Sequence, residues 1–441
     1  MKWLKRLAIA LVVLIVLATA LPFFITLDRF IPEIEQQASA RLNEPVTVKS
    51  LQFGLLPVPH LTVDGITVGK ALDIKLGKVT ITPVLLSLLS ATKVIKSIEL
   101  KSLELTQKAL EKIPVWSKQD KAGTPPLVRV ESIRLDDALV KFDKTAFGPF
   151  DGRVSLDSTG QPIDALITTQ DGTLKILVKP DQANFLIDAV AKGWKPPVGP
   201  PIEFDELVIQ GVATLYGADL NQISARLYGG TVNGKATAAW RKGLQLKGGF
   251  ELQQVELKSL VPLVSPGTKV SGRLNAQPVF SASAADAAQL LNALHLETSF
   301  NLQNGILYGV DLVKAATSLL KQGAAGGETH FDHLSGHLVR DRGAYQFTQL
   351  RISSGALAAD GNVNISAKQD LSGRVNAQVK AAGTSANIPL NVAGTTHSPL
   401  LYPTGGTMAG AAIGSVVMPG VGTGIGAKAG QAIENIFGKK K

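Results

Sequence analysis

Residues 128–142 read VRVESIRLDDALVKF, and this stretch decides the fold. Its apolar side chains alternate with polar ones, beginning with Val128 and Val130. Successive side chains of an extended strand point to opposite faces, so the alternation predicts a half-buried β-strand. After the pair Asp136-Asp137 the apolar residues resume one position out of phase. A slip of this kind predicts a turn or a β-bulge.

The same period of two recurs along most of the chain up to about residue 403. It is visible in VTVKSLQFG (46–54) and in residues 98–105, where a slip falls at Lys101-Ser102. Glycine-rich turns separate the segments beyond residue 202. We therefore expect a mainly β protein with few helices, whose elongated, curved antiparallel sheet has one consistently aliphatic face.

A few segments have helical spacing instead. Residues 30–42 place apolar side chains three or four positions apart, which predicts a short amphipathic helix. Residues 181–192, 286–294 and 310–322 are further helix candidates. Residues 84–89 (VLLSLL) fit either a buried helical turn or a fully covered strand.

The N-terminus predicts a membrane anchor. Residues 7–27 contain no Asp, Glu, Lys or Arg, and Lys2, Lys5 and Arg6 precede them. As a helix this run would be roughly 30 Å long, which matches the hydrocarbon core of a bilayer. The positive flank predicts a cytoplasmic N-terminus and an exported remainder. A cleaved signal peptide is the alternative, because residues 18–20 (Ala-Thr-Ala) resemble a cleavage site. The length of the apolar run favours the anchor.

Two breaks rich in Pro and Gly, at 117–127 and 193–201, interrupt the strand pattern. The second reads GWKPPVGPP and resists both helix and ladder formation. The predicted organisation is a cytoplasmic stub with transmembrane anchor at 1–28, an N-terminal β region at 29–192, a Pro-rich linker at 193–201, a C-terminal β region at 202–403, and a Gly-rich tail at 404–441.

In the tail, residues 404–427 carry no charge, and glycines recur at every fourth position in two sets. On a helix this spacing gathers small residues on one face and permits close backbone approach in lipid. The predicted glycine face comprises Gly406, Gly410, Gly414, Gly422, Gly426 and Gly430. A re-entrant membrane hairpin and a flexible tail both fit this pattern.

The composition excludes several functional classes. The chain has no cysteine, so it has no disulfide framework and no thiolate metal site. Part of the net charge of +10 lies at the two ends of the chain, and aromatic residues make up only 5 %. A nucleic-acid stripe with stacking platforms is therefore not expected, and no cofactor is implied.

Two clusters are candidates for a metal or catalytic site. His333 and His337 would share one face of a strand and His330 would point the other way, which favours a solvated strand over a metal site. Asp136-Asp137 sits where turn chemistry explains two acids without catalysis. No Gly-x-Ser-x-Gly motif is present. We expect no enzymatic activity.

Several motifs, taken in order, resemble the AsmA family of Gram-negative envelope proteins. They include EPVTVKSLQFGLLPVPHLTVDGITVG (44–69), VESIRLDDALVKF (130–142) and ISARLYGGTVNGKATA (223–238). FNLQNGILYGVDL, THFDHLSGHLV, LRISSGALAADGNVNI and IPLNVAGTTHSPLLYPT follow in the family's order. The resemblance implies a protein anchored in the inner membrane, periplasmic in bulk, that affects outer-membrane assembly or lipid traffic.

The predicted helices are too few to cover a long aliphatic face. We therefore expect a hydrophobic β-groove of AsmA type that lipid acyl chains complete, since each buried CH₂ contributes about 0.8 kcal/mol. The expected partners are membrane phospholipids, the inner membrane and outer-membrane assembly factors. The candidate lining residues are Val212, Leu215, Leu227, Val232, Leu350, Ile352 and Val363. A closed envelope scaffold that binds assembly factors without lipid, and an exported hydrolase, are the alternatives.

Overall fold

The computed structural model describes residues 27–106, 108–109, 112, 128–142, 145–197, 199–241, 243–265, 267–285, 289–317, 326–355, 357–381 and 384–404. Contacts divide them into two compact units. Unit 1 takes the described residues up to 197 together with Ile209–Tyr216, and unit 2 takes Gly199–Val208 and the described residues from Gly217 onward. The strand β12 (Phe204–Thr214) contributes residues to both units.

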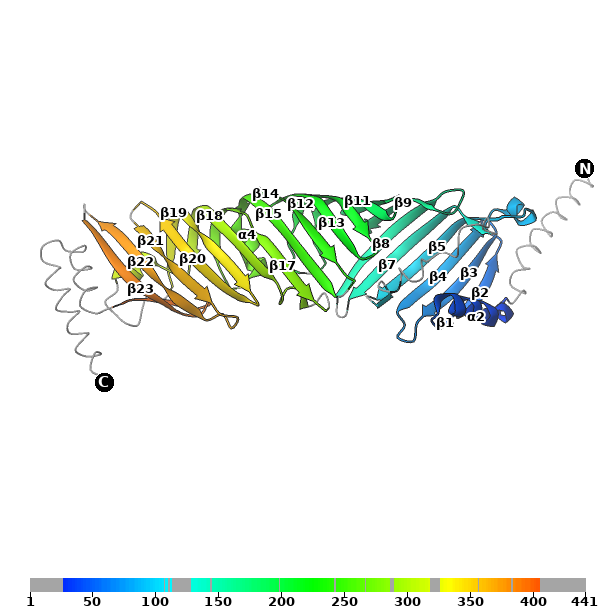
Figure 1. The fold of residues 1–441 in the computed structure, drawn as a ribbon, viewed down its shortest axis with the longest axis horizontal. Coiled ribbons are helices and arrows are strands. Elements are labelled where there is room, and N and C mark those ends of the chain that lie inside the picture. The colour runs from blue at the N-terminus through cyan, green and yellow to red at the C-terminus, as the bar shows by residue number, and fades with distance from the viewer. Residues whose placement is uncertain are drawn as a thin grey trace, which may run out of the picture. The chain divides into compact units, whose positions relative to one another are not determined.

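Unit 1 is a sheet with a short helix against its first strands (Figure 1, blue to green). Its neighbours pair antiparallel, except that β5 pairs in parallel with β6 and with β7. The predicted antiparallel sheet is therefore confirmed, with β5 as the exception. Its elements are η2 (Asp28–Phe30), α2 (Ile31–Leu42), β1 (Val46–Thr47), β2 (Ser50–Gly54), β3 (His60–Val68), β4 (Ile74–Pro83), η3 (Leu85–Leu89), β5 (Lys93–Thr106), β6 (Val128–Val130), β7 (Ser132–Phe142), β8 (Thr145–Leu156), β9 (Pro162–Thr169), β10 (Leu174–Asp181) and β11 (Asn184–Trp194).

The helix α2, predicted over residues 30–42, supplies hydrogen-bond acceptors to the edge of the sheet. Its Glu35 carboxylate accepts from the backbone N–H of Val48 (2.7 Å), and Ser39 Oγ accepts from that of Val46 (2.9 Å). The Asp28 carboxylate accepts from the Leu51 N–H (3.2 Å). These side chains satisfy donors that an edge strand would otherwise leave open to pairing with another chain. Leu27 and Ile31 pack on the small core of Leu51, Val63 and Val79.

Two predictions fail in unit 1. Residues 181–192 are not a helix, because they lie largely in β11, which pairs with β10 along most of its length. The alternation of Phe185, Ile187, Ala189 and Ala191 is a period of two that ends in buried alanines, and the absence of Gly and Pro in the window concealed it. Residues 85–89 form a 3₁₀ helix, which agrees with the helical alternative, but the predicted burial is wrong because its four leucines are exposed.

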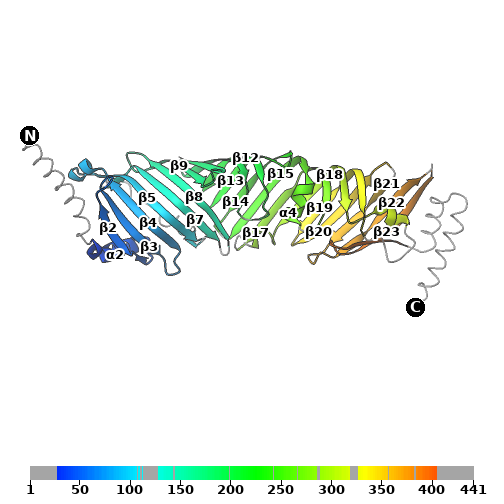
Figure 2. The ribbon, with the colours of Figure 1, turned by 180° about the vertical axis from the view of Figure 1, so that it is seen from behind.

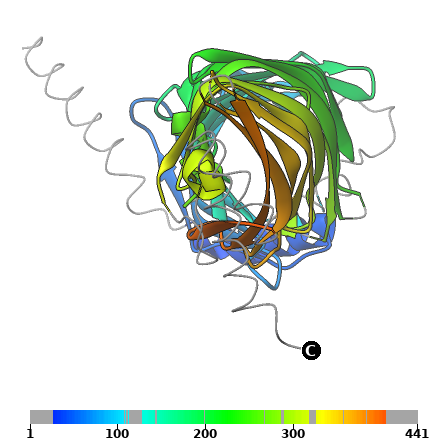
Figure 3. The same cartoon turned by 90° about the vertical axis from the view of Figure 1, so that its left-hand side faces the viewer.

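Unit 2 is an antiparallel sheet whose strands curve, as the end-on view with the orange strands nearest shows (Figure 3). The strands β16 and β17 both pair with β15 and β18, so they act as one strand interrupted between Ala276 and Val279. The elements are β13 (Gly217–Leu227), β14 (Gly230–Ala239), β15 (Leu244–Glu256), α4 (Leu257–Val264), β16 (Val270–Ala276), β17 (Val279–Ala284), β18 (His295–Tyr308), α5 (Leu312–Thr317), β19 (Glu328–Asp341), β20 (Ala344–Ser353), β21 (Leu357–Ile365), β22 (Leu371–Ala381), β23 (Thr384–Gly394) and β24 (Pro399–Pro403).

The predicted helix at 310–322 is confirmed over α5, while the residues from 318 to 325 lie outside the described residues. The candidate at 286–294 forms turns over its described part, residues 289–294.

A β-bulge recurs inside the strands of both units. Asp137 has a left-handed backbone with φ of 61°, and the register of β7 with β8 shifts between Leu135 and Ala138. Gln254 in β15 and Gln349 in β20 have φ of 56° and 52° beside equivalent shifts. The phase slip predicted at Asp136-Asp137 is thus a bulge within a continuous strand. Bulges bend a strand and increase its twist, which curves the sheet.

Each of these three bulges is held by a side chain on the neighbouring strand. The backbone N–H of Asp137 donates to Asp151 Oδ1 (3.1 Å), and the backbone N–H of Gln254 donates to Asn275 Oδ1 (3.0 Å). The amide of Gln349 donates to Asn362 Oδ1 (3.0 Å). A bulged residue leaves the ladder, so its N–H needs another acceptor, and a short Asx side chain supplies one.

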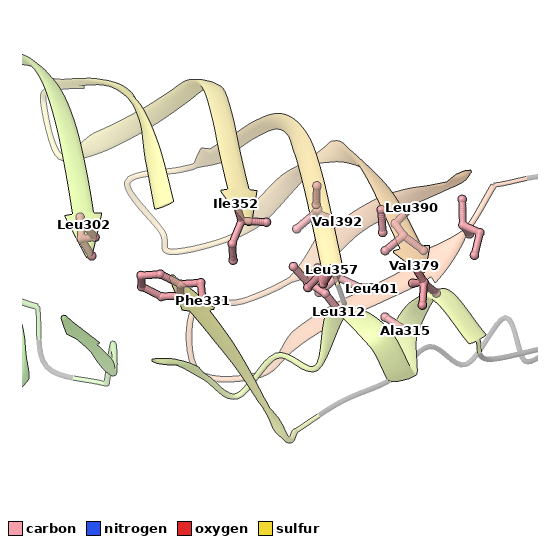
Figure 4. Packing of buried hydrophobic residues seen from close by; sticks show 14 of the residues in the cluster. Leu302, Leu312, Ala315, Phe331, Ile352, Leu357, Val379, Leu390, Val392 and Leu401 are labelled. Atoms are coloured by element: carbon pink, nitrogen blue, oxygen red, sulfur yellow. The ribbon is translucent and has the colours of Figure 1, made fainter. Parts of the chain in front are cut away.

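The core of unit 2 lies between its curved strands and α5 (Figure 4). Leu312 and Ala315 of α5 lie next to Leu357, Val379 and Leu401. Ala315 and Ala316 are fully buried, because their small side chains let the helix approach the sheet closely. Ile388 and Leu390 of β23 complete this core, with relative exposures of 1 % and 0 %.

No helix within the described residues is both long and apolar enough to cross a bilayer. The predicted anchor at 7–27, apart from Leu27, and the predicted glycine face of the tail (406–430) lie outside the described residues.

We predict that Leu390→Ala lowers the free energy of unfolding of unit 2 by about 2–5 kcal/mol, because it removes a fully buried side chain and leaves a cavity. Urea titration of the purified chain measures the loss. Val279→Ala, at a β17 side chain that is 63 % exposed, is the control and should change stability by less than about 0.5 kcal/mol. Equal effects of the two changes would contradict the assigned core.

We also predict that Asn275→Ala costs about 1–2 kcal/mol of stability, because the backbone N–H of the half-buried Gln254 then loses its acceptor. Asn275→Asp, which keeps the acceptor oxygen, should recover most of this loss. A stability unchanged by Asn275→Ala in the same urea titration would show that the bulge does not need the Asx side chain.

Candidate functional site: an apolar cavity in unit 2

Unit 2 contains a cavity of about 630 Å³ on the inner side of its last strands. The strands β18 to β24 each contribute side chains to its wall, among them Val375 of β22 and Val392 of β23. The aliphatic wall residues are Leu307, Leu334, Leu350, Ile352, Val363, Ile365, Leu371, Val375, Val392 and Leu401. The volume falls within the range typical of small-molecule pockets, about 300–1,000 Å³.

The bulge at Gln349 determines which side chains of β20 face this cavity. Before it, Phe347 packs against Phe300 in an edge-to-face arrangement with ring centroids 6.2 Å apart. After it, Leu350 and Ile352 line the cavity, although their sequence parity is opposite to that of Phe347. In a regular strand, residues of opposite parity face opposite sides of the sheet. The extra residue of the bulge shifts the alternation by one position, so Leu350 and Ile352 face the same side as Phe347. Aromatic and aliphatic side chains of β20 therefore share the inner face.

The helix α5 bounds one side of the cavity. Leu312 belongs both to the cavity wall and to the core beneath α5. Its backbone N–H donates to Thr329 Oγ1 (3.0 Å), and that buried hydroxyl donates to the Val310 carbonyl (2.8 Å). These bonds satisfy polar groups next to an apolar wall, where an unpaired one would be costly. The helix is thereby fixed as a partial lid on the sheet.

A few polar side chains join the wall, from the loop before β16 and the turn before β24. They include Thr268, Lys269 and His397. Thr396 lies beside His397 and donates its hydroxyl to Gln369 Oε1 (3.0 Å). Asp360 of β21 also belongs to the lining, so the polar groups carry charges of both signs. An aliphatic interior with a polar border suits an amphiphile: an apolar chain inside and a polar head at the border.

The structure brings together three of the seven predicted lining residues. Leu350, Ile352 and Val363 line the cavity, from β20 and β21. Leu227 and Val232 lie in β13 and β14 of unit 2 and do not contribute to this wall. Val212 (β12) and Leu215, in the turn that follows, belong to unit 1. Leu215 is 39 % exposed.

Sequence reasoning missed most of the other wall residues. Leu334, Val375 and Val392 lie on strands that the alternation predicts, and each is visible as an apolar position of the pattern. The missing information is long-range: only the pairing of β18 to β24 shows which inward positions surround one space. Ala359 and Gly361 contribute by being small, a signal that hydropathy does not carry.

The histidines His330, His333 and His337 of β19 do not form a cluster. His330 Nε2 lies 2.9 Å from Glu328, and His337 Nε2 lies 3.1 Å from Glu297. His333 is exposed, whereas the next residue, Leu334, lines the cavity. Within the residues that the structure describes, no group of three or more His, Asp or Glu side chains is placed to hold a metal ion.

The acid pair of β7 also has structural partners. Asp136 lies 3.3 Å from Lys101 Nζ on the surface, and Asp137 accepts from Ser102 Oγ (3.0 Å). These contacts join β7 to β5. The pair lies at a bulge within β7, so the turn expected there from the sequence is wrong.

A second charged cluster lies elsewhere in unit 1. The buried Asp73 pairs with Lys112 Nζ (2.7 Å), which also reaches Glu44. Hydrogen bonds to Asp73 and Glu44 raise the pKa of Lys112. This cluster ties the helix end at Asn43 and Glu44 to the β3–β4 turn.

Comparison with known proteins decides the family. The family model for the AsmA family matches residues 1–120 and 214–350. The chain belongs to the AsmA family. AsmA family membership indicates an envelope-associated protein. Neither the search of curated proteins nor the search of solved structures gave a match. The matched residues include β13 to β19 and most of β20, so the first half of the cavity wall lies within the family match.

We predict that Val363→Gln weakens binding of a fluorescent fatty-acid probe by about tenfold. An amide without a partner in an apolar wall costs roughly 1–3 kcal/mol. Equilibrium titration with the purified chain measures the affinity. Val279→Gln, at an exposed position outside the wall, should leave the affinity unchanged. The same affinity for all three proteins would place the probe elsewhere.

Proposed function

We propose that this AsmA family protein is anchored in the inner membrane with its bulk in the periplasm, and that it holds or conducts lipid acyl chains in a hydrophobic β-groove. In this way it would support outer-membrane assembly and lipid homeostasis. The observation that carries the proposal is the cavity of unit 2, whose wall is aliphatic from β18 to β24. The role is one of binding and needs no catalytic residue.

Burial supplies the affinity in this proposal. The cavity wall is aliphatic and incompletely covered by α5, so water in contact with it is replaced when an acyl chain enters. Each CH₂ group that leaves water contributes about 0.8 kcal/mol, so a chain of about eight buried groups gains roughly 6 kcal/mol before its losses of freedom. The interaction is not directional, which suits a ligand that slides.

The polar border supplies a place for a head group. Lys269 carries a positive charge beside the cavity, and Thr268 and His397 offer hydrogen-bonding groups. An anionic phospholipid phosphate pairs well with an ammonium group at a partly desolvated site. An amphiphile whose phosphate contacts Lys269 and lies away from Asp360 therefore fits the site better than a neutral hydrocarbon would.

A scaffold that binds outer-membrane assembly factors without lipid is the second candidate. It is favoured by the close packing of α5 on β22 to β24, since that part of the inner face is covered by protein alone. Such a scaffold would use the exposed outer faces of the strands, and its cavity would remain free of lipid.

Native mass spectrometry of the full chain, purified in a mild detergent from membranes, separates the two candidates. We expect bound phospholipid on the wild-type chain and at least a fivefold lower occupancy on a Val363→Gln, Leu350→Gln double variant. A double variant with Val279→Gln and Val264→Gln, at exposed positions, is the control. A wild-type chain that carries no lipid and folds normally would favour the scaffold.

A further inference from the structure

A second apolar feature lies in unit 1, at one end of the strands β2 to β5, which lie side by side (Figures 1 and 2). Two connections meet there: the β2–β3 loop (residues 55–59) and η3, which joins β4 to β5. Gly54 pairs with His60, and Pro83 pairs with Ile95, so both connections leave the sheet at the same end. We name this end the leucine rim.

The rim exposes an unusual set of side chains. Leu86 and Leu89 of η3 are 83 % and 91 % exposed. Leu85, Leu88, Leu56 and Val58 are between 47 % and 68 % exposed, as is Val128 (49 %), which pairs with Lys93 at the same end of the sheet. Single exposed apolar residues are normal on a protein surface, but a contiguous group marks a site of interaction.

The rim is held in this conformation by polar bonds and not by its leucines. Ser87, which is buried, donates its hydroxyl to the Val84 carbonyl (2.6 Å) and accepts from the Val94 N–H (2.8 Å). Lys93 Nζ donates to the carbonyls of Leu88 (2.9 Å) and Ser90 (2.5 Å). These bonds hold the η3 connection in place, while Leu86 and Leu89 project outward and remain largely exposed.

Behind the rim lies an apolar hollow of about 260 Å³. Leu88 and Val128 of the rim line it together with Phe53, Leu61 and Ile81. Apolar surface therefore continues from the exposed leucines onto the sheet. A polar partner surface would leave this hollow unfilled, whereas fluid hydrocarbon adapts to it.

Charge and position indicate what covers the rim. No Asp or Glu occurs in residues 53–63 or 82–98, whereas Lys93 and Lys96 do. Beside Val128, the charge of Glu131 is balanced by Arg129, 3.0 Å away. Juxtamembrane lysines are attracted to anionic lipid surfaces. Leu27, at the end of the predicted membrane span, packs on Leu51 and its neighbours. Gly54, at the rim, follows Leu51 by only a few residues along β2 and lies roughly 10 Å from it.

We propose that the leucine rim inserts into the lipid surface of the membrane in which the predicted anchor sits. Leu85, Leu86, Leu88 and Leu89 enter the region between head groups and acyl chains, as the apolar face of an interfacial helix does, and Lys93 and Lys96 stay at head-group level. The insertion fixes unit 1 against the bilayer at a second point beside the anchor. It is independent of lipid binding by unit 2.

The absence of cysteine makes a direct test possible with the full chain. Ser90→Cys, at an exposed position next to η3, is labelled with the fluorophore NBD, and the chain is reconstituted in vesicles of phosphatidylcholine and phosphatidylglycerol. Nitroxide-bearing lipid is then added to the vesicle composition. We expect at least a twofold loss of NBD fluorescence. The matched label at Lys70→Cys, in the turn at the opposite end of β3 and β4, should lose almost none.

Leucine variants show whether the side chains cause the insertion. In the Ser90→Cys background, Leu86→Gln with Leu89→Gln should reduce the quenching by at least half. Leu166→Gln with Leu186→Gln, which alters two leucines of unit 1 that are 43 % and 44 % exposed, should not change it. These leucines lie on β9 and β11, away from the connections that form the rim.

Two results would overturn the proposal. If the label at position 90 is as unquenched as that at position 70 and remains accessible to aqueous iodide, the rim lies in water. If it is shielded from iodide but not quenched by nitroxide lipid, protein and not lipid covers the rim.

Discussion

The structure of both units depends on the left-handed residues inside their strands. A strand that keeps strict alternation has one set of inward positions, and it runs nearly straight. In β7, β15 and β20 one bulged residue shifts that set by one position, and an Asx side chain on the neighbouring strand captures the amide that the shift releases. The aliphatic residues on both sides of the bulge then face inward together. The bend and the continuous apolar face have the same cause.

A curved apolar face must be covered, and unit 2 covers its own only in part. The short helix α5 seals the region under β22 to β24, where Ala315, Ala316 and Leu390 lose all contact with water. Beside it the same strands line an open cavity. The buried hydroxyl of Thr329 connects these two regions, since it holds the first turn of α5 against β19. The described part of α5 therefore covers one side of this concave face, and the cavity lies beside it.

The strands could be predicted from the sequence because alternation is a local signal. The interruption at Asp137 could be predicted for the same reason, and the structure decides between a turn and a bulge in favour of the bulge. The prediction failed where the local signal was ambiguous: β11 resembles a helix because Ala189 and Ala191 carry little hydropathy contrast. For the site, the sequence predicts that aliphatic strand residues line it, but not which of these residues surround the same cavity. Leu350, Ile352 and Val363 line one cavity because β20 and β21 lie side by side in unit 2, whereas Val212 and Leu215 have a similar local pattern but belong to unit 1.

The failure at residues 85–89 has a different cause. Four leucines within five residues predict burial, but hydropathy alone cannot distinguish a core from a surface that meets another apolar phase. The distinction lies in the polar groups. In the core of unit 2 the backbone is satisfied by strand pairing, and the leucines supply the packing. In η3, Ser87 and Lys93 hold the connection through polar bonds, and Leu86 and Leu89 remain largely exposed. A loop whose conformation is secured without its apolar side chains leaves those side chains available for a surface outside the fold. The two apolar features of the chain therefore differ in what they accept: the concave wall of unit 2 fits a single chain-like ligand, whereas the outward leucines of η3 fit an extended hydrocarbon surface.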